Sequence, residues 1–266
     1  MASLEPDWPA PVNIKVLFSD RRGGCSHAPY ASLNLGSHVG DDAALVTRNR
    51  ASIDVPGEPY WLEQTHTDIC VNADSDATDR LGDASITREQ GKVLAIMVAD
   101  CLPVMFTSRG GDIVGIAHAG WRGLADGVLS STVMALGSGS MLAWMGPAIG
   151  PCHYTVGEDV RASFSSGTGF AKCPEKAKCP EKAKRPEKAK RPENASSAEN
   201  ANSANSANSA ESKFSMDLYA IANEQLQSLG VEVYGGGLCT YCDSSRFFSY
   251  RRDGVTGRMG GFIWME

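Results

Sequence analysis

The distribution of apolar and polar residues predicts strands that alternate with helices along most of the chain. Uninterrupted apolar runs at 93–99 and 113–119 are typical of strands that are covered on both faces. Further strands are predicted at 14–18, 102–106, 141–146, 231–237 and 261–265. Pro103 has no backbone N–H to donate, so it favours an edge strand or a bulge for 102–106.

Two segments have the apolar spacing of helices. Apolar residues recur at helical spacing over 124–136, and the amphipathic segment 214–229 ends before Gly230, a common position for a glycine cap. Strands and helices alternate on both sides of 172–212. The pattern therefore predicts one α/β domain over 1–266, built from mixed β-sheets flanked by helices.

The segment 172–212 differs from the rest of the chain. It repeats CPEKAK and RPEKAK and continues into an NSA tract, without any aromatic or large aliphatic residue. Such a composition cannot bury enough apolar surface to offset the entropy lost on ordering. We predict a low-complexity, disordered insertion within the domain.

Composition and charge exclude several function classes. The formal net charge of -6 argues against nucleic-acid binding, which requires a basic face. No apolar run approaches the 18 residues typical of a membrane span, so we expect no membrane contact. The N-terminus lacks the basic and apolar regions of a secretory signal. Eight cysteines without such a signal predict reduced thiols in the cytoplasm.

Three residues with metal-binding or nucleophilic side chains lie where an apolar element meets a turn: His66, Cys101 and His118. One thiolate and two imidazoles form a plausible zinc shell with an open fourth position. The same residues could instead supply a nucleophile, Cys101, and its base, His118, with Asp100 or Asp126 orienting the imidazole. A buried cysteine and hydrogen-bonded histidines without chemistry are a third interpretation, and the spacing alone favours it.

Two other segments allow a functional and an ordinary interpretation. CTYC at 239–242 has the spacing of half a zinc knuckle or a redox pair, but the chain has no second C-x-x-C, and ordinary packing is favoured. The segment 247–261 contains aromatics and three arginines, and is interpreted either as an anion site or as a solvated hairpin.

Several motifs in the same order resemble the YfiH-like laccase-domain family, whose members are also described as multicopper polyphenol oxidases, peptidoglycan editing factors and bacterial purine nucleoside phosphorylases. The motifs are QTH at 64–66, ADCLPV at 99–104, HAGWRG at 118–123, GPAIGPC at 146–152 and the segment 239–262. DRRGGCS and ASLNLGSHVGDD match the N-terminal signature. The resemblance covers roughly 14–163 and 214–265.

The resemblance implies a single-domain fold of mixed sheets related in architecture to cysteine hydrolases. It implies Zn²⁺ as cofactor, with His66, Cys101 and His118 as ligands and catalytic residues. The implied activity is phosphorolysis of adenosine, inosine, guanosine and methylthioadenosine, together with adenosine deamination. The implied partners are purine nucleosides and phosphate, and we expect a cytoplasmic monomer.

The family's names disagree, and the histidine count helps to separate them. A multicopper laccase requires many imidazoles, typically in His-x-His pairs, whereas this chain has five histidines and no such pair. Adventitious Cu²⁺ with weak polyphenol oxidase activity stays an alternative. So does a Cys101-dependent hydrolase or editing factor that acts on peptidoglycan precursors. An interaction module with a structural zinc ion is a more distant third.

Phosphorolysis requires cationic donors for phosphate. Arg21, next to two glycines, is the first candidate, with Arg122 and Arg251 as alternatives. Asn34 and Gln64 are predicted to hydrogen-bond the nucleoside.

Deamination requires a group that transfers a proton. Asp100, beside Cys101, and Glu63, near His66, are the candidates. The His-x-Glu arrangement of cytidine-type deaminases is absent.

Overall fold

The computed structural model describes residues 3–75, 79–172 and 213–266. The predicted insertion at 172–212 lies outside the described residues except for Lys172, so its predicted disorder stays a prediction. Within the described ranges no helix has both the length and the apolar character that a membrane crossing would need.

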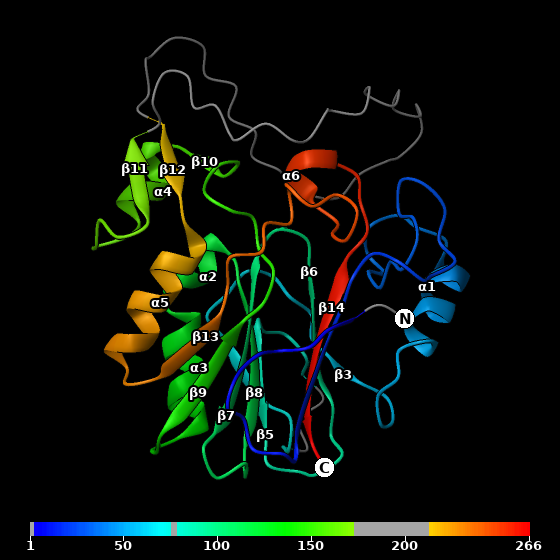
Figure 1. Cartoon of the computed structure of the whole chain (residues 1–266), viewed down its shortest axis with the longest axis horizontal. Helices are drawn as coiled ribbons and strands as arrows, with labels where there is room; N and C mark the ends of the chain where they lie inside the picture. Colours follow the sequence, from blue (N-terminus) through cyan, green and yellow to red (C-terminus); the bar gives the residue numbers. More distant parts are fainter. Residues whose placement is uncertain (1–2, 76–78, 173–212) are drawn as a thin grey trace.

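Two large mixed β-sheets form the centre of the molecule (Figure 1). The six-stranded sheet has the order β13-β9-β7-β8-β5-β4, and the five-stranded sheet has the order β1-β2-β14-β6-β3. The strands of the first are β13 (Glu232–Gly235), β9 (Met141–Met145), β7 (Leu102–Ser108), β8 (Val114–Ala119), β5 (Ala84–Thr87) and β4 (Cys70–Asn72). Those of the second are β1 (Ser3–Leu4), β2 (Ile14–Ser19), β14 (Met259–Met265), β6 (Leu94–Val98) and β3 (Tyr60–Trp61).

Alternation of side chains along the strands produces three apolar clusters. Met105 of β7 and Ile116 of β8 pack with residues of β6, β2 and β14 between the sheets. Val104 and Phe106 belong to the cluster that includes α2 (Trp121–Asp126), α3 (Val128–Leu136) and α5 (Leu218–Ser228). A third cluster covers the far side of the five-stranded sheet, near α1 (Ala43–Ala51). The uninterrupted apolar runs are therefore strands buried on both faces, as predicted.

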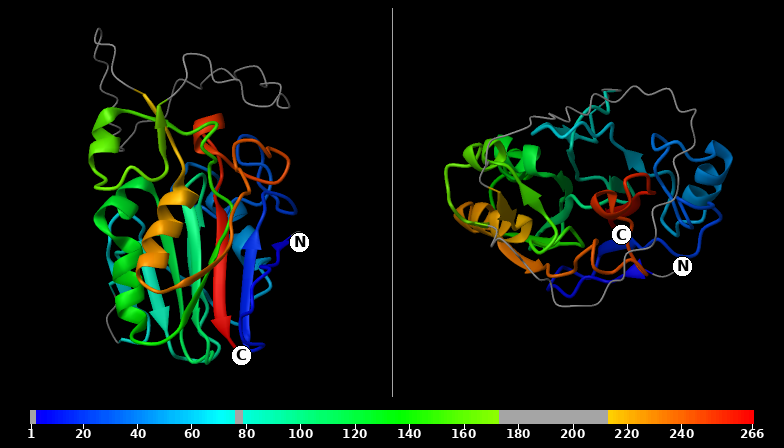
Figure 2. Two further views of the ribbon diagram at one scale, coloured as in Figure 1. Left: turned by 60° about the vertical axis from the view of Figure 1, so that its left-hand side comes forward. Right: turned by 90° about the horizontal axis from the view of Figure 1, so that it is seen from above.

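Figure 2 shows α3 and α5 covering one side of the six-stranded sheet. A smaller sheet of β10 (Thr155–Val156), β12 (Phe214–Met216) and β11 (Phe170–Lys172) lies at one end of the molecule with α4 (Glu158–Ala162). The short helix α6 (Tyr250–Asp253) lies at the same end. In the smaller sheet Lys172 is paired with Phe214, so the two flanks of the low-complexity segment are neighbours.

The edge-strand prediction for 102–106 is wrong. Strand β7 is central, paired with β8 on one side and β9 on the other. Proline is tolerated because Pro103 lies at the second residue of the strand, where its missing N–H costs little. Its carbonyl still accepts the Gly146 N–H at 2.9 Å.

The observed helices differ from the predicted ranges 124–136 and 214–229. The expected helix over 124–136 is two helices, because Gly127 adopts a φ of 100° and ends α2 in a left-handed conformation. The expected helix over 214–229 starts only at Leu218, because Asp217 caps it by accepting the N–H groups of Tyr219 and Ala220. The residues before Asp217 form β12. The predicted end at Gly230 is confirmed, with a φ of 74°.

Candidate metal centre

Strand pairing brings the three predicted ligands to one end of the two large sheets. Cys101 directly precedes β7, and His118 lies near the end of β8. The antiparallel register of these strands pairs Pro103 with His118, so both residues lie at the same sheet end. His66 follows β3, which runs parallel to β6. Residues that are distant in sequence thus converge where the central strands meet their loops.

The side chains of the three residues form a compact cluster. The Cys101 Sγ lies 3.7 Å from the His66 Nε2, and the two imidazole centroids are 4.9 Å apart. One donor atom from each residue lies within 4.8 Å of the other two. His118 is 4% exposed, Cys101 is half-buried and His66 is exposed, so the cluster is enclosed on one side and accessible on the other. A substrate could approach it from the His66 side.

Asp83 fixes the orientation of His118. Its Oδ1 lies 2.7 Å from the His118 Nδ1, which leaves Nε2 as the free donor atom of the ring. Its Oδ2 accepts hydrogen bonds from the Thr67 N–H and hydroxyl and from the Thr65 N–H, the residues on either side of His66. One fully buried carboxylate therefore orients one imidazole and holds the loop of the other.

Mutual interaction shifts the pKa values in this cluster. Burial by itself would raise the pKa of the Cys101 thiol, but the adjacent His118 and His66 lower it to about 6. Burial would lower the pKa of His118, but the Cys101 thiolate and Asp83 raise it to about 9. Desolvation disfavours the charged form of Asp83, yet hydrogen bonding to His118 lowers its pKa to about 2. Without a metal, the cluster at neutral pH is a thiolate beside an imidazolium.

The backbone approaches the cluster closely at Gly120. A Cβ added to Gly120 would lie 2.9 Å from the His66 Cδ2 and 3.0 Å from the Cys101 Sγ, so only glycine fits there without displacing a ligand. His66 and Asp100 both adopt positive φ angles, 64° and 94°, which are uncommon for residues other than glycine. The donor set of one thiolate and two imidazoles suits zinc, and the geometry accommodates it.

Comparisons with known proteins identify the family of the chain. The family model described as multi-copper polyphenol oxidoreductase laccase matches residues 15–266. The chain belongs to this family. A Pseudomonas aeruginosa protein named purine nucleoside phosphorylase is 41% identical over 100% of this chain and 99% of its own length. An Escherichia coli purine nucleoside phosphorylase, YfiH, is 39% identical over 98% of each chain.

Solved structures of the family have the same architecture. A Neisseria meningitidis protein superposes with a TM-score of 0.81 at 38% identity, covering 99% of both chains. YlmD from Geobacillus stearothermophilus gives a TM-score of 0.75 at 29% identity, covering 97% of this chain and 94% of its own. The predicted fold class, a single domain of mixed sheets flanked by helices, is confirmed.

Other residues predicted from the sequence have partners within the fold. The Asp100 carboxylate accepts the Thr240 hydroxyl at 2.6 Å and the Arg251 N–H at 2.7 Å. Gln64 pairs its side-chain amide with both backbone groups of Met97. Buried Asn34 holds the backbone N–H groups of Gly36 and Arg258 with its Oδ1. These polar groups fasten loops to the sheets.

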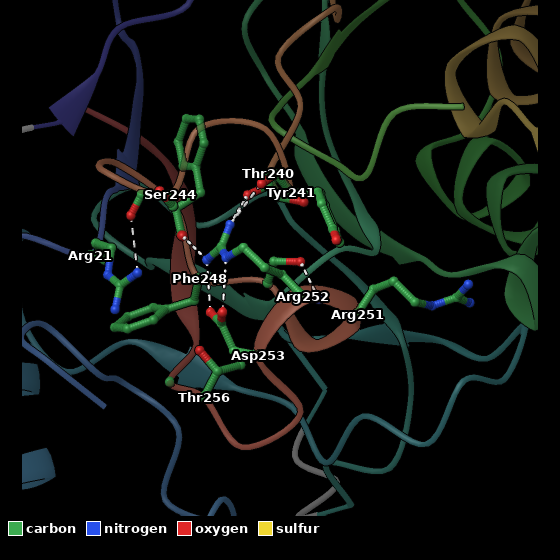
Figure 3. Close-up of polar contacts among 12 residues, drawn as sticks. Arg21, Thr240, Tyr241, Ser244, Phe248, Arg251, Arg252, Asp253 and Thr256 are labelled. Carbon is green, nitrogen blue, oxygen red and sulfur yellow. Dashed lines mark hydrogen bonds and ion pairs between the residues drawn. The ribbon is translucent and has the colours of Figure 1, made fainter. Parts of the chain in front are cut away.

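Figure 3 separates the arginines of this end of the molecule into two kinds. Arg21 donates to the carbonyls of Ala31 and Ser244 and lies 4.6 Å from the Phe248 ring centroid, while burial lowers its pKa. Arg252 likewise donates to carbonyls, those of Thr240, Tyr241 and Phe247, and to Asp253. Their donors are directed at the protein. The hairpin, one of the two interpretations of 247–261, is not formed: this segment contains α6 and the beginning of β14.

Arg251 differs in being exposed. It extends away from Arg21 and Arg252 in Figure 3, donates to the Thr155 carbonyl at 3.0 Å and has its guanidinium 4.9 Å from the Tyr154 ring centroid. Burial raises the pKa of the Tyr154 hydroxyl, the Cys101 thiolate raises it further, and Arg251 and Arg122 act in the opposite direction. Tyr154 therefore shares the electrostatic environment of Cys101 with two exposed cations.

Sequence reasoning missed Asp83 and Tyr154. Asp83 stands alone between Gly82 and a strand, in LGDASIT, and its partner His118 is identified only by the pairing of β5 with β8. Tyr154 follows the GPAIGPC loop. The only sequence signal for Asp83 was an isolated aspartate before an apolar strand.

Proposed function

We propose that this chain is a zinc-dependent purine nucleoside phosphorylase that also deaminates adenosine. One observation carries the proposal: a thiolate and two imidazoles converge at a half-open sheet end, with one imidazole held by a buried carboxylate. Two exposed arginines and the half-buried Tyr154, whose pKa is affected by Cys101, would supply the anion and aromatic contacts that a nucleoside and phosphate require. The relatives named purine nucleoside phosphorylase support the substrate class.

His66, Cys101 and His118 would hold the metal, the last through Nε2. Zinc would supply Lewis acidity to polarise an oxygen of the substrates. Asp83 keeps His118 in the required tautomer and holds the loop that carries His66. Asp83 therefore acts by orienting the two histidine ligands.

In phosphorolysis, a phosphate oxygen forms a bond to C1′ of the ribose, and the C1′–N9 bond breaks. Its electron pair leaves with the purine, which takes up a proton, and ribose 1-phosphate is the second product. Arg122 and Arg251 are the proposed phosphate contacts, because both guanidinium groups are exposed beside Tyr154. The Tyr154 hydroxyl is the proposed hydrogen-bond donor to the purine, because it is protonated at neutral pH and burial raises its pKa further.

Arg21, Asn34, Gln64 and Asp100 receive a different proposed role from the one first predicted. Each already binds backbone or side-chain groups within the fold. We assign them to positioning: they hold the loops that shape the site.

The deaminase activity is proposed for the same site. Water adds at C6 of adenosine, ammonia leaves and inosine forms. Glu63 is an exposed carboxylate three residues before His66 and stays the candidate for proton transfer.

A cysteine hydrolase is the second candidate, because a specific arrangement favours it. Cys101, whose pKa is lowered, would be the nucleophile, and the adjacent His118 would be its base. The Asp83 carboxylate on the His118 Nδ1 would orient the imidazole. Such an enzyme would act on amide or ester bonds, as in peptidoglycan precursors, without a metal.

Adenosine separates the candidates. The metal-loaded protein is incubated with adenosine, with and without phosphate, and adenine, ribose 1-phosphate, inosine and hypoxanthine are followed by chromatography and mass spectrometry. We expect phosphate-dependent adenine and phosphate-independent inosine, both lost after chelation and restored by zinc. No turnover would contradict the proposal, and amide or ester hydrolysis that survives chelation would favour the hydrolase.

A matched set of variants tests the phosphate contacts. Arg122→Gln and Arg251→Gln should raise the KM for phosphate, whereas Arg48→Gln, an exposed arginine on α1, should leave it unchanged. An unchanged KM in both site variants would remove these residues from the proposal. Copper loading with a polyphenol substrate tests the oxidase alternative, and the cytoplasmic location and monomeric state stay predictions.

A further inference from the structure

A second cluster of metal-binding side chains lies outside the candidate active site. Cys239 and Cys242, the two cysteines of CTYC, converge with His153, and one donor atom of each lies within 4.8 Å of the other two. The Cys242 Sγ is 3.4 Å from the His153 Nδ1. Cys239 and His153 are half-buried and Cys242 is exposed. A C-x-x-C pair and a distant histidine are a common ligand combination for zinc.

The surroundings of the cluster favour thiolate ligands. The Gly150 N–H donates to the Cys239 Sγ at 3.2 Å, an interaction that stabilises negative charge on sulfur. The His153 ring stacks on Tyr241 with centroids 4.0 Å apart and planes inclined by 13°, which fixes the imidazole plane. Cys152 lines the same pocket as Cys239 and Cys242, but its Sγ is not among the donor atoms that lie within 4.8 Å of one another, so it joins them only if its side chain turns.

Ordinary packing, the interpretation that the sequence favoured, does not account for this arrangement. Two of the three side chains are only half-buried and the third is exposed, so they contribute little to an apolar core. Their polar atoms face one another across two chain segments. Two backbone hydrogen bonds also join these segments: the Ala148 N–H donates to the Leu238 carbonyl, and the Thr240 N–H donates to the Ala148 carbonyl.

We propose that Cys239, Cys242 and His153 form a second, structural zinc site, with Cys152 as the fourth ligand once its side chain turns toward the other three. The site is distinct from His66, Cys101 and His118. A Cys₃His set is the closed, four-coordinate type that stabilises loops, whereas the active-site set has three protein ligands and an open position. The chain therefore binds two zinc ions of different function.

The second ion would fasten the two loops that bear on the active site. The Thr240 hydroxyl donates to the Asp100 carboxylate, and the Ile149 N–H donates to the Asp100 carbonyl. Asp100 directly precedes Cys101, and Tyr154 directly follows His153. A metal that joins these loops holds both neighbours of the active-site cluster in place.

Zinc content per chain tests the proposal directly. The full-length protein, expressed with zinc and purified under reducing conditions, should contain two zinc ions per chain by elemental mass spectrometry. The double variant Cys239→Ser/Cys242→Ser should contain one, and so should Cys101→Ser. The control Cys25→Ser, at a cysteine outside both clusters, should keep two. One zinc ion in the wild type that is unaffected by the double substitution would overturn the proposal.

Cobalt substitution of Cys101→Ser keeps the test decisive if the double variant does not fold. This variant removes the only thiolate of the active site and leaves the second cluster intact. We expect Co²⁺ to give thiolate charge-transfer absorption in this variant. Adding Cys152→Ser or His153→Gln should weaken this absorption without removing it. No such absorption, or a Cys239–Cys242 disulfide detected by mass in the reduced preparation, would overturn it. Zinc content does not depend on phosphorolysis, so the two proposals fail separately.

Discussion

The two candidate metal-binding clusters have the same types of side chain in opposite proportions. The proposed active-site cluster has one cysteine and two histidines where the central strands meet their loops, with a carboxylate on one imidazole. The second cluster has two cysteines and one histidine on loops, with a backbone N–H on one sulfur. The first is most enclosed at its histidine His118, whereas the second is most exposed at its cysteine Cys242.

The difference indicates that the groups hydrogen-bonded to the ligands, a carboxylate in one cluster and a backbone N–H in the other, suit different functions. A carboxylate on His118 fixes a neutral ligand and leaves an open side for a substrate, which suits catalysis. A third cysteine in the same pocket and an N–H···S bond favour a closed shell of four ligands, which suits a structural role. The contrast predicts different responses to pH and to substitution.

The largest expected effect is the pH dependence of metal binding at the active-site cluster. Between pH 6 and 9 the metal-free cluster holds a thiolate and an imidazolium, because the pKa of Cys101 is lowered to about 6 and that of His118 raised to about 9. Zinc must displace the proton on His118, so affinity should fall about tenfold for each pH unit below 9, roughly a thousandfold over this range.

Calorimetry in buffers of different ionisation enthalpy measures this proton. In the Cys239→Ser/Cys242→Ser variant, which isolates the active-site cluster, we expect about one proton released per zinc at pH 7.5 and a larger number as the pH falls through the pKa of Cys101, about 6. Affinity that does not change between pH 6 and 9 would show that the Cys101–His118 pair holds no proton in this range.

Removing the Asp83 carboxylate should give the next largest effect. Asp83→Asn leaves His118 without its charged partner and weakens the hold on the Thr65–Thr67 loop, so zinc affinity and turnover should fall about 10–100-fold. The second cluster should keep its ion, which makes zinc content the discriminating readout. Asp126→Asn, at an exposed position of α2, is the matched control and should change neither quantity.

A smaller effect is expected from a single methyl group at Gly120. In Gly120→Ala the added Cβ meets His66 and Cys101 at 2.9–3.0 Å, so at least one ligand must move and zinc affinity should fall severalfold, a loss of about 1 kcal/mol. Gly110→Ala, where the nearest atom is 3.5 Å away, is the control. If both variants bind zinc like the wild type, the close approach at Gly120 has no bearing on the site.

The smallest effect on catalysis is expected from Tyr219→Phe. The Tyr219 hydroxyl lies 2.8 Å from the Leu238 carbonyl and accepts the Ala148 N–H at 2.8 Å, so it joins the same loops as the second cluster. Its loss should lower the free energy of unfolding by about 1–3 kcal/mol in denaturant titrations and leave zinc affinity at the active-site cluster unchanged. Exposed Tyr250→Phe should lower neither.

Most strands could be predicted from the sequence, because continuous apolar runs such as 93–99 and 113–119 are buried on both faces. Pro103 misled the prediction, since its effect depends on its place at the beginning of a strand and not on its presence. Gly127 and Asp217 were missed as helix boundaries because the apolar spacing continues across them. Local backbone conformation overrides the periodicity at both residues.

The candidate site was predicted in part. His66, Cys101 and His118 were singled out because each lies where an apolar element meets a turn, and the structure brings the three together. The contacts of Asp83 with His118, and those of Asn34 and Gln64 within the fold, were not predicted, because the partner of a polar side chain is set by strand register. Register cannot be determined from one sequence. The same limit applies to CTYC, whose histidine partner lies far away in the chain.

The pairing of Lys172 with Phe214 has a consequence for how this chain can change in length. The chain leaves the small sheet and returns to it at adjacent positions, so the closure entropy grows only slowly with the number of residues added between them. Insertions here need not disturb the strand ends that carry His118 and Cys101. The β11–β12 pair is therefore an entry point at which evolution, or an engineer grafting a reporter peptide, can add sequence at little energetic cost.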